Sequence, residues 1–198
     1  DKPPICERLY YTVVKDEQGL PDVAYGVSMN VTEQMLERER FQRAMQSMLS
    51  ANPDALSTFE LNLTQNLNRA VMGTSPYILR QLDTKTADDI FENARSEIVD
   101  EASRKDFEAV FARAALLDAF AAGKGNRHVD IRRCDDSGKQ IWVRVFINML
   151  RNPETDDVEA VVYSLDVSKE KQNQLIYDLI TNEEHDFVAL LHTADNKA

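Results

Sequence analysis

The sequence predicts an α+β protein in which strands and amphipathic helices occupy separate stretches of the chain. Some segments alternate apolar and polar residues with the period of two that a half-buried strand requires. Others place apolar residues three and four positions apart, as in a helix with one buried face. In addition, one strand-to-helix junction occurs twice. Together these patterns indicate hairpins of strands with helices between them.

The recurring junction is a strand that runs into a charged helix. AYGVSMNVTEQ fills residues 24–34, and AVVYSLDVSKE fills residues 160–170, which is 136 positions later without a gap. Alternate positions in each segment are large and apolar, so we expect them to face a core. These positions are Tyr25, Val27, Met29 and Val31 in the first segment and Val161, Tyr163, Leu165 and Val167 in the second. Two copies at a domain-sized spacing predict a tandem array.

The N-terminal part is expected to form a hairpin followed by a helix. Strands are predicted at residues 8–14 and 23–31, on either side of the turn KDEQGLPD. Thr32 is a suitable N-cap for the helix, and Pro53 cannot continue it. The apolar stripe of this helix contains Leu36, Phe41, Met45 and Met48.

The middle of the chain is predicted to be helical. It begins after two short strands in ALSTFELNLTQNLNRAVMG, and residues 75–123 then favour helices. Thr86 and Asp89 resemble a capping box. Ser103 is expected to cap one continuous helical stripe, which Gly123 would end.

Three strands follow, and then a second linker helix. RHVDIRRC and KQIWVRVFINML flank the turn DDSG, and VEAVVYSLDVS follows the turn RNPETDD. Ser168 is expected to cap a helix whose apolar side includes Leu175 and Leu179. The final segment DFVALLHTADN is similar in pattern to DALSTFELNLT and predicts another strand.

Composition excludes several classes of protein. The chain of 198 residues has a formal net charge of −11, which disfavours nucleic-acid binding and docking on anionic lipid. No apolar run approaches the roughly 20 residues of a membrane span. Cys6 and Cys134 form no disulfide framework, and we expect free thiols of a reducing, cytoplasmic compartment. Because the chain does not begin with Met, we expect a fragment of a longer protein.

The meander NRHVDIRRCDDSGKQIWVRVFINMLRNPETDDVEAVVYSLDVSKEK resembles the C-terminal half of a PAS domain. Its Asp-Val-Ser sequence at 166–168 matches the Asp-Ile-Thr type of motif that joins a PAS core to its signalling helix. The Asn-Val-Thr sequence at 30–32 matches it with Asn in place of Asp. The resemblance implies a PAS-like five-stranded antiparallel sheet with helices on one face, flanked by amphipathic linker helices.

The resemblance also divides the chain into five parts. A complete PAS-like domain is expected at residues 53–168, between linker helices at 33–52 and 169–184. Residues 1–32 would be the C-terminal hairpin of a preceding PAS-like repeat, and residues 185–198 the start of a further one.

The implied function is that of a sensory and signal-relay module from a bacterial signalling protein, such as a diguanylate cyclase/phosphodiesterase or a sensor histidine kinase. A ligand or partner event in the PAS core would shift an exit helix, which drives a downstream output domain in the same chain. The implied relay residues are Asn30, Thr32, Asp166 and Ser168.

Eight apolar residues are candidates for lining a cavity for a small-molecule ligand of unknown identity, although such residues more often simply fill the core. The candidates are Phe107, Phe111, Ile131, Val143, Val145, Ile147, Val161 and Tyr163. Haem is not expected, because the helix before the meander has no histidine. A photoactive flavin is not expected, because Cys134 lies at a strand end and not in an Asn-Cys-Arg helical motif.

No catalytic residue and no metal site are predicted. The sequence has no phosphate-binding Gly-rich loop, cyclase signature or ATP-binding motif, and its three histidines lack metal-ligand spacing. His185 lacks the Arg-Thr-Pro surroundings of a phospho-accepting histidine, and His128 is expected to face solvent. Two other functions stay open: a ligand-free structural or dimerisation PAS spacer, and a small-molecule enzyme.

Two associations are also predicted. The stripes of the linker helices would pair in a homodimer, or alternatively pack on their own sheet; they contain Leu36, Phe41, Met45 and Met48, and Leu175 and Leu179. The strand expected at residues 186–192 has the right type to pair with the hairpin strand at 23–31, within one chain or between two.

Overall fold

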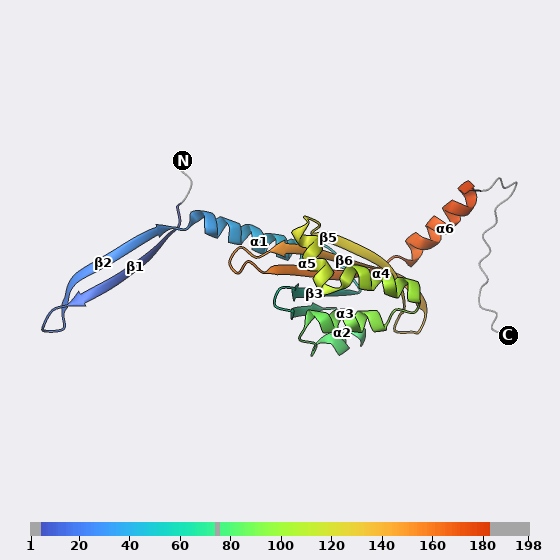
Figure 1. The fold of residues 1–198 in the computed structure, drawn as a ribbon, viewed down its shortest axis with the longest axis horizontal. Helices are drawn as coiled ribbons and strands as arrows, with labels where there is room; N and C mark the ends of the chain where they lie inside the picture. The colour runs from blue at the N-terminus through green and yellow to red at the C-terminus, as the bar shows by residue number, and fades with distance from the viewer. Residues whose placement is uncertain (1–4, 74–75, 183–198) are drawn as a thin grey trace.

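The computed structural model describes residues 5–73 and 76–182 of the chain, and it shows a hairpin, a linker helix, a compact domain and an exit helix in series (Figure 1). The strand predicted at 186–192 lies outside these residues, as do His185 and His192. The elements are β1 (Glu7–Lys15), β2 (Pro21–Asn30), α1 (Thr32–Ser50), β3 (Ser57–Asn62), β4 (Leu67–Met72), α2 (Pro76–Gln81), α3 (Ala87–Ser96), α4 (Glu101–Phe111), α5 (Arg113–Ala121), β5 (Asn126–Cys134), β6 (Gln140–Arg151), β7 (Val158–Asp166) and α6 (Ser168–Asn182).

The domain is built on a five-stranded antiparallel sheet with the strand order β4-β3-β7-β6-β5. This order confirms the predicted α+β fold class. The last strand of the meander, β7, lies in the centre of the sheet, between β3 and β6. The sheet therefore joins the two ends of the domain directly.

Helices α2 to α5 pack on one face of the sheet, which we call the helix face. Alternate residues of β6 point to this face and are buried, which is the pattern that the sequence predicted for KQIWVRVFINML. The helices contribute a second apolar layer against them. Prominent members of this core are Phe59, Ile78, Ile90, Phe91, Phe107, Phe111, Leu116, Val143, Val145 and Ile147.

The start of α4 differs from the prediction. Asp100, and not Ser103, is its N-cap: the Ser103 N–H donates to Asp100 Oδ1 at 2.9 Å, and the Ser103 hydroxyl donates to Oδ2 at 2.8 Å. The Ser103 N–H lowers the pKa of Asp100 to about 2. A carboxylate is a stronger acceptor than a hydroxyl at the positive end of a helix, which explains the choice. Thr86 caps α3, with the Asp89 N–H donating to Thr86 Oγ1. The Asp89 carboxylate accepts from the Thr86 hydroxyl, so the first half of the predicted capping box is present.

The predicted continuous stripe through residues 103–123 is two helices. Ala112 adopts an extended conformation (φ −60°, ψ 125°) that ends α4 and lets α5 begin at the next residue. There the Arg113 side chain donates to the Leu63 carbonyl oxygen at 3.1 Å, which joins the start of α5 to the residue after β3. Gly123, at φ +78°, ends α5 as predicted.

The linker helices lie away from α2 to α5. Helix α1 contacts β7, and Met45 is only 7% exposed although it is outside the main core cluster. The apolar stripe of α1 therefore packs partly on its own domain, while Leu36 is 45% exposed. On α6, Leu175 is exposed, and the side chain of Leu179 is outside the described part. None of the helices described is long and apolar enough to cross a membrane.

Removing a large core side chain should be costly. Because Phe111 is almost fully buried among Phe91 and Phe107, Phe111→Ala should lower the free energy of unfolding by about 3–5 kcal/mol in urea denaturation. The matched control is Leu82→Ala at an exposed position, which should change it by less than about 0.5 kcal/mol. Equal losses in the two variants would contradict this description of the core.

Candidate functional site

A small cavity lies between the helix face of the sheet and α3 and α4. Its volume is about 30 Å³. A cavity of this size holds about one water molecule, whereas pockets for organic ligands are of the order of several hundred Å³. The lining consists of Ser57, Phe59, Ile90, Phe91, Ala94, Phe107, Phe111, Ile131, Arg133, Val143, Val145, Val162 and Ser164. The two serine hydroxyls bond each other at 2.6 Å.

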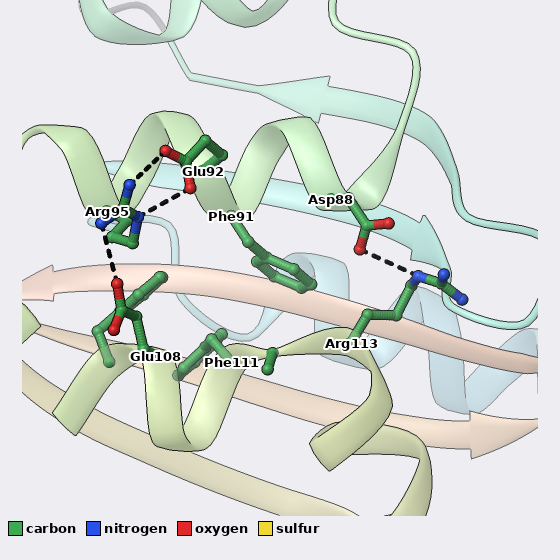
Figure 2. A pocket seen from close by; sticks show the side chains of 9 residues that line it. Asp88, Phe91, Glu92, Arg95, Glu108, Phe111 and Arg113 are labelled. Atoms are coloured by element: carbon green, nitrogen blue, oxygen red, sulfur yellow. Dashed lines mark hydrogen bonds and ion pairs between the residues drawn. The ribbon is translucent and has the colours of Figure 1, made fainter. Parts of the chain in front are cut away.

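Three phenylalanines separate this cavity from the surface. Phe107 and Phe111 come one turn apart on α4 and stack with ring centroids 4.7 Å apart, while Phe91 of α3 meets Phe111 edge to face at 5.7 Å. All three rings also line a larger pocket of about 400 Å³ on the outside (Figure 2). They therefore form a wall between the outer pocket and the inner cavity.

Ion pairs close the rim of the outer pocket, as the dashed lines in Figure 2 show. At one side Arg95 of α3 bonds Glu92 at 2.6 Å and reaches Glu108 of α4 at 2.9 Å. At the other side Arg113 of α5 bonds Asp88 of α3 at 3.0 Å. The bond from Arg95 lowers the pKa of Glu92. These pairs join α3 to both neighbouring helices across the mouth of the pocket.

The structure brings most of the predicted pocket residues together. Those that line the inner cavity are Phe107, Phe111, Ile131, Val143 and Val145. Ile147 is fully buried in the same core but does not line the cavity.

Val161 and Tyr163 lie on the opposite face of the sheet, which we call the linker face. Tyr163 is directly across from Phe146, and the two rings stack at 4.8 Å. The cavity instead receives Val162 and Ser164, the residues between them. The prediction chose the larger residues of β7 for the core. In the structure the smaller residues of β7 face this core, because large phenylalanines from the helices fill the space next to it. Val161 is buried on the linker face, where α1 contacts β7.

The cavity lining does not fit the chemistry of haem or of a photoactive flavin. Its residues include neither histidine nor cysteine. Cys134 is exposed at the end of β5, where the sequence placed it. His128 is exposed as predicted, with its ring 5.6 Å from that of Phe146.

A second functional feature is the junction between β7 and α6. Asp166 Oδ1 accepts a hydrogen bond from the Ser168 N–H at 2.8 Å. Contrary to the prediction that it caps α6, the Ser168 hydroxyl accepts from the Trp142 N–H of β6 at 3.0 Å. The Val167 N–H donates to the Trp142 carbonyl oxygen at 2.9 Å. The Asp-Val-Ser motif thus attaches the first residue of α6 to the backbone of β6.

Charged side chains on the linker face hold the first turn of α6. Arg144 of β6 bonds Asp130 of β5 at 2.6 Å and Glu170 of α6 at 3.0 Å. Lys171 of α6 reaches Asp130 at 2.5 Å and lies over the Trp142 ring. Hydrogen bonds from Arg144 and then Lys171 lower the pKa of Asp130 to about 2. We call these residues the exit cluster.

The exit cluster was missed in the sequence. Its charged members are far apart along the chain, and single charges next to strands are usually solvated. The usable signal was register: Asp130 and Arg144 are directly opposite each other once RHVDIRRC and KQIWVRVFINML are paired around their turn. The contact with α6 depends on how the helix leaves the sheet, which no local pattern encodes.

The junction before α1 has the same hydrogen bonds as the junction before α6. Asn30 Oδ1 accepts from the Thr32 N–H at 3.0 Å. Thr32 Oγ1 accepts from the Cys6 N–H at 2.9 Å, and the Val31 N–H donates to the Cys6 carbonyl oxygen at 2.9 Å. Thr32 therefore bonds the hairpin and does not act as the N-cap of α1; the N-cap is Val31, without a side-chain bond. Each of these four residues lies 136 positions before its counterpart.

No family model and no curated protein matches the chain. Solved structures that are similar to it include the N-terminal domain of a diguanylate cyclase with PAS/PAC sensor from Marinobacter aquaeolei, at 14% identity and a TM-score of 0.35, covering 58% of this chain and 97% of that one. A sensory box histidine kinase/response regulator from Burkholderia thailandensis has 17% identity and a TM-score of 0.39, with 72% and 95% coverage. A light-oxygen-voltage domain studied with a flavin analogue has 16% identity and a TM-score of 0.39, with 73% and 96% coverage.

The first of these solved structures carries a PAS/PAC sensor in its name, and PAS is the family that the sequence resembles. Identities of 14% to 17% transfer no ligand or activity to this chain. The description of the fold rests on the strand order of the chain itself.

The exit cluster should titrate in acid. The carboxyl group of Asp130 should show a midpoint near its pKa of about 2, against an ordinary value of 3.8, when its carbon chemical shift is followed by NMR. Because the folded-state pKa is lowered, the cluster stabilises the fold above about pH 4 and loses this contribution as the pH falls toward 2. Lys171→Met should raise the midpoint, and the control Lys169→Met, at an exposed position, should not. A wild-type midpoint near 3.8 would contradict the described cluster.

Proposed function

We propose that residues 53–168 form a PAS-type sensory and signal-relay module of a multidomain signalling protein. An event in the core or at a partner surface shifts β6, and α6 carries the shift to an output domain in the same chain. The parent protein would be a cytoplasmic homodimer of the diguanylate cyclase/phosphodiesterase or histidine kinase kind, with the exposed apolar residues of α6 available for pairing.

One observation carries this proposal: successive residues of β6 alternate between the cavity and the exit helix. Val143 and Val145 line the cavity. Trp142 and Arg144, on the other side of the same strand, hold Ser168 and Glu170 at the start of α6. A displacement of β6 by a change in the cavity therefore acts on the base of α6 without an intermediate element.

The contacts at the base of α6 suit a relay because they are polar and directional. A hydrogen bond weakens steeply when its angle departs from linearity, whereas an apolar contact tolerates sliding. The net contribution of each bond is about 1 kcal/mol, so a small movement is enough to change the balance between two positions of the helix. The bonds from the Trp142 N–H and to its carbonyl oxygen both act at one residue of β6.

A second candidate function is a ligand-free structural spacer, and the cavity volume favours it. About 30 Å³ is too small for an organic ligand unless Phe91, Phe107 and Phe111 move. A spacer of this kind would transmit partner or dimer geometry through β6 and α6 without binding a small molecule.

Native mass spectrometry of the purified chain, compared with its denatured mass, separates these two functions. We expect the folded chain to carry no additional small molecule, because the inner cavity is small. This result would favour an input from a partner over a resident ligand. A mass excess that is lost on denaturation would show a ligand-bound sensor and a displaced phenylalanine wall.

The relay itself can be tested by making the cavity responsive to a probe. Phe107→Ala should join the cavity to the outer pocket and allow indole to bind, since enlarged apolar cavities bind aromatic molecules. Binding should change the amide exchange rates of residues 168–171 by several-fold. Val143→Ala is the milder second variant if the first unfolds.

The matched control for this test is Leu82→Ala, which leaves the cavity unchanged and should show no response to indole. If indole binds, as measured by calorimetry, and the exchange of residues 168–171 stays the same, β6 does not couple the cavity to α6 and the proposal fails.

A further inference from the structure

We propose that the β1–β2 hairpin is the docking surface for the other strands and helices of a second sheet of the same kind, supplied by the segment that precedes it in the same polypeptide. This inference concerns residues 6–31 and is independent of the function proposed for the domain. It rests on a comparison within the chain, because β6 and β7 show how such a hairpin is covered.

The hairpin is apolar on both faces and exposed on both. Large apolar side chains lie on either side of the two-stranded ribbon, and Tyr11 is 77% exposed. An isolated two-stranded hairpin is marginally stable in water, and strands with two apolar faces are typical of the interior of a layered domain. The exposed large apolar residues are Leu9, Tyr10, Tyr11, Val13, Val14, Val23, Tyr25, Val27 and Met29.

The register of the hairpin is that of β6 and β7. Tyr10 is opposite Val27 as Phe146 is opposite Tyr163, and each residue lies 136 positions before its counterpart. The correspondence extends along the ladder from the pair Glu7–Asn30 to the pair Val14–Val23 and ends at the irregularity beside Lys15. With the identical hydrogen bonds at the two junctions, this makes β1–β2–α1 a structural copy of β6–β7–α6.

One pair of opposite residues in the hairpin differs from its counterpart in the domain in how side-chain size is divided between the two strands. Tyr11 is opposite Gly26 where the domain has Ile147 opposite Val162. In the hairpin a large tyrosine lies opposite a glycine, whereas in the domain two residues of intermediate size lie opposite each other. The two pairs occupy equivalent positions, and in the domain this position lies on the helix face, so the hairpin is suited to a core of similar thickness.

In the domain both edges of the copied hairpin are occupied. β5 pairs with the free side of β6, and β3 pairs with the free side of β7. Within residues 5–73 and 76–182, β1 and β2 pair with each other alone, so each has one unpaired edge. The Leu56 N–H donates to the Ser164 carbonyl oxygen, which places the equivalent carbonyl of Ser28 on the unpaired edge of β2. Alternation along an antiparallel ladder then puts the Leu9, Tyr11 and Gly26 amides on the unpaired edges.

The missing strands are expected from the same polypeptide because of how the domain is connected. β5 is joined to β6 by the short turn Asp135–Lys139, so the equivalent strand has to precede β1 closely. In a second copy of this chain, the corresponding strands are already paired inside a complete sheet. Among the described residues, a separate copy therefore offers the outer edges of β4 and β5 and those of its own hairpin, and none of these is equivalent to β3 or to the side of β5 that pairs with β6.

Hydrogen exchange of two chain lengths tests the proposal. One is the 198-residue chain, and the other is the natural protein extended by about 90 residues before Asp1, the span from β3 to β6 in the domain. The amides of Leu9, Tyr11 and Gly26 should be protected at least about 100-fold more in the extended chain. Those of Tyr10 and Thr12 point into the existing ladder and should be protected in both, which provides an internal control.

A substitution pair extends the test. In the extended chain, Tyr11→Asp should remove the added protection at Leu9 and Gly26, while Glu17→Ser in the exposed turn should retain it. Leu9→Ala is the milder variant if Tyr11→Asp prevents expression. Unprotected edge amides in the extended chain would overturn the proposal. The proposal would also be overturned if the edge amides were already protected in the 198-residue chain and this chain had twice the monomer mass. That result would assign the surface to a second copy of the chain.

Discussion

The structure depends on the position of β6, which has a neighbouring strand on each side and a packed layer on each face. Its odd-numbered residues meet the phenylalanines of α3 and α4, and its even-numbered residues meet the exit cluster and the stacked rings of Phe146 and Tyr163. Because consecutive side chains of a strand point in opposite directions, neither face can change without the other. The cavity, the exit junction and the base of α6 all contact this one strand, which is buried on the helix face and partly buried on the linker face.

The phenylalanine wall determines what kind of event the core can report. Phe91, Phe107 and Phe111 pack between the sheet and the helices and line a cavity that holds about one water molecule. The ion pairs of Arg95 and Arg113 close the helices above these rings. An input to this core is therefore a displacement of packed rings or of the sheet itself, and the close packing of protein interiors transmits such a displacement over several residues.

The same pattern of hydrogen bonds joins a hairpin to a helix at two places in the chain. In each, an Asn or Asp side chain binds the N–H two residues later, and a Ser or Thr hydroxyl binds the N–H of the preceding hairpin strand. Because the hydroxyl bonds the backbone of the neighbouring strand, it does not cap the helix. At α6, charged side chains bind the first turn of the helix instead, through Glu170 and Lys171. At α1 the equivalent positions are Gln34 and Met35, and this helix instead contacts β7 and forms the ion pair between Arg38 and Glu154.

The sequence by itself determined the strands of the sheet, the helical middle, the N-cap at Thr86 and the recurrence of the junction, because these depend on periodicity and on residues close in the chain. The side of β7 that faces the core was decided only by tertiary structure, since both sets of alternate residues are apolar enough to be buried and the phenylalanines from α3 and α4 select the smaller set. The break at Ala112 likewise lies beside a tertiary contact, the bond from Arg113 to Leu63, which is distant in sequence. The exit cluster joins Asp130, Arg144 and Lys171 through strand register and helix direction, and neither is encoded in a local pattern.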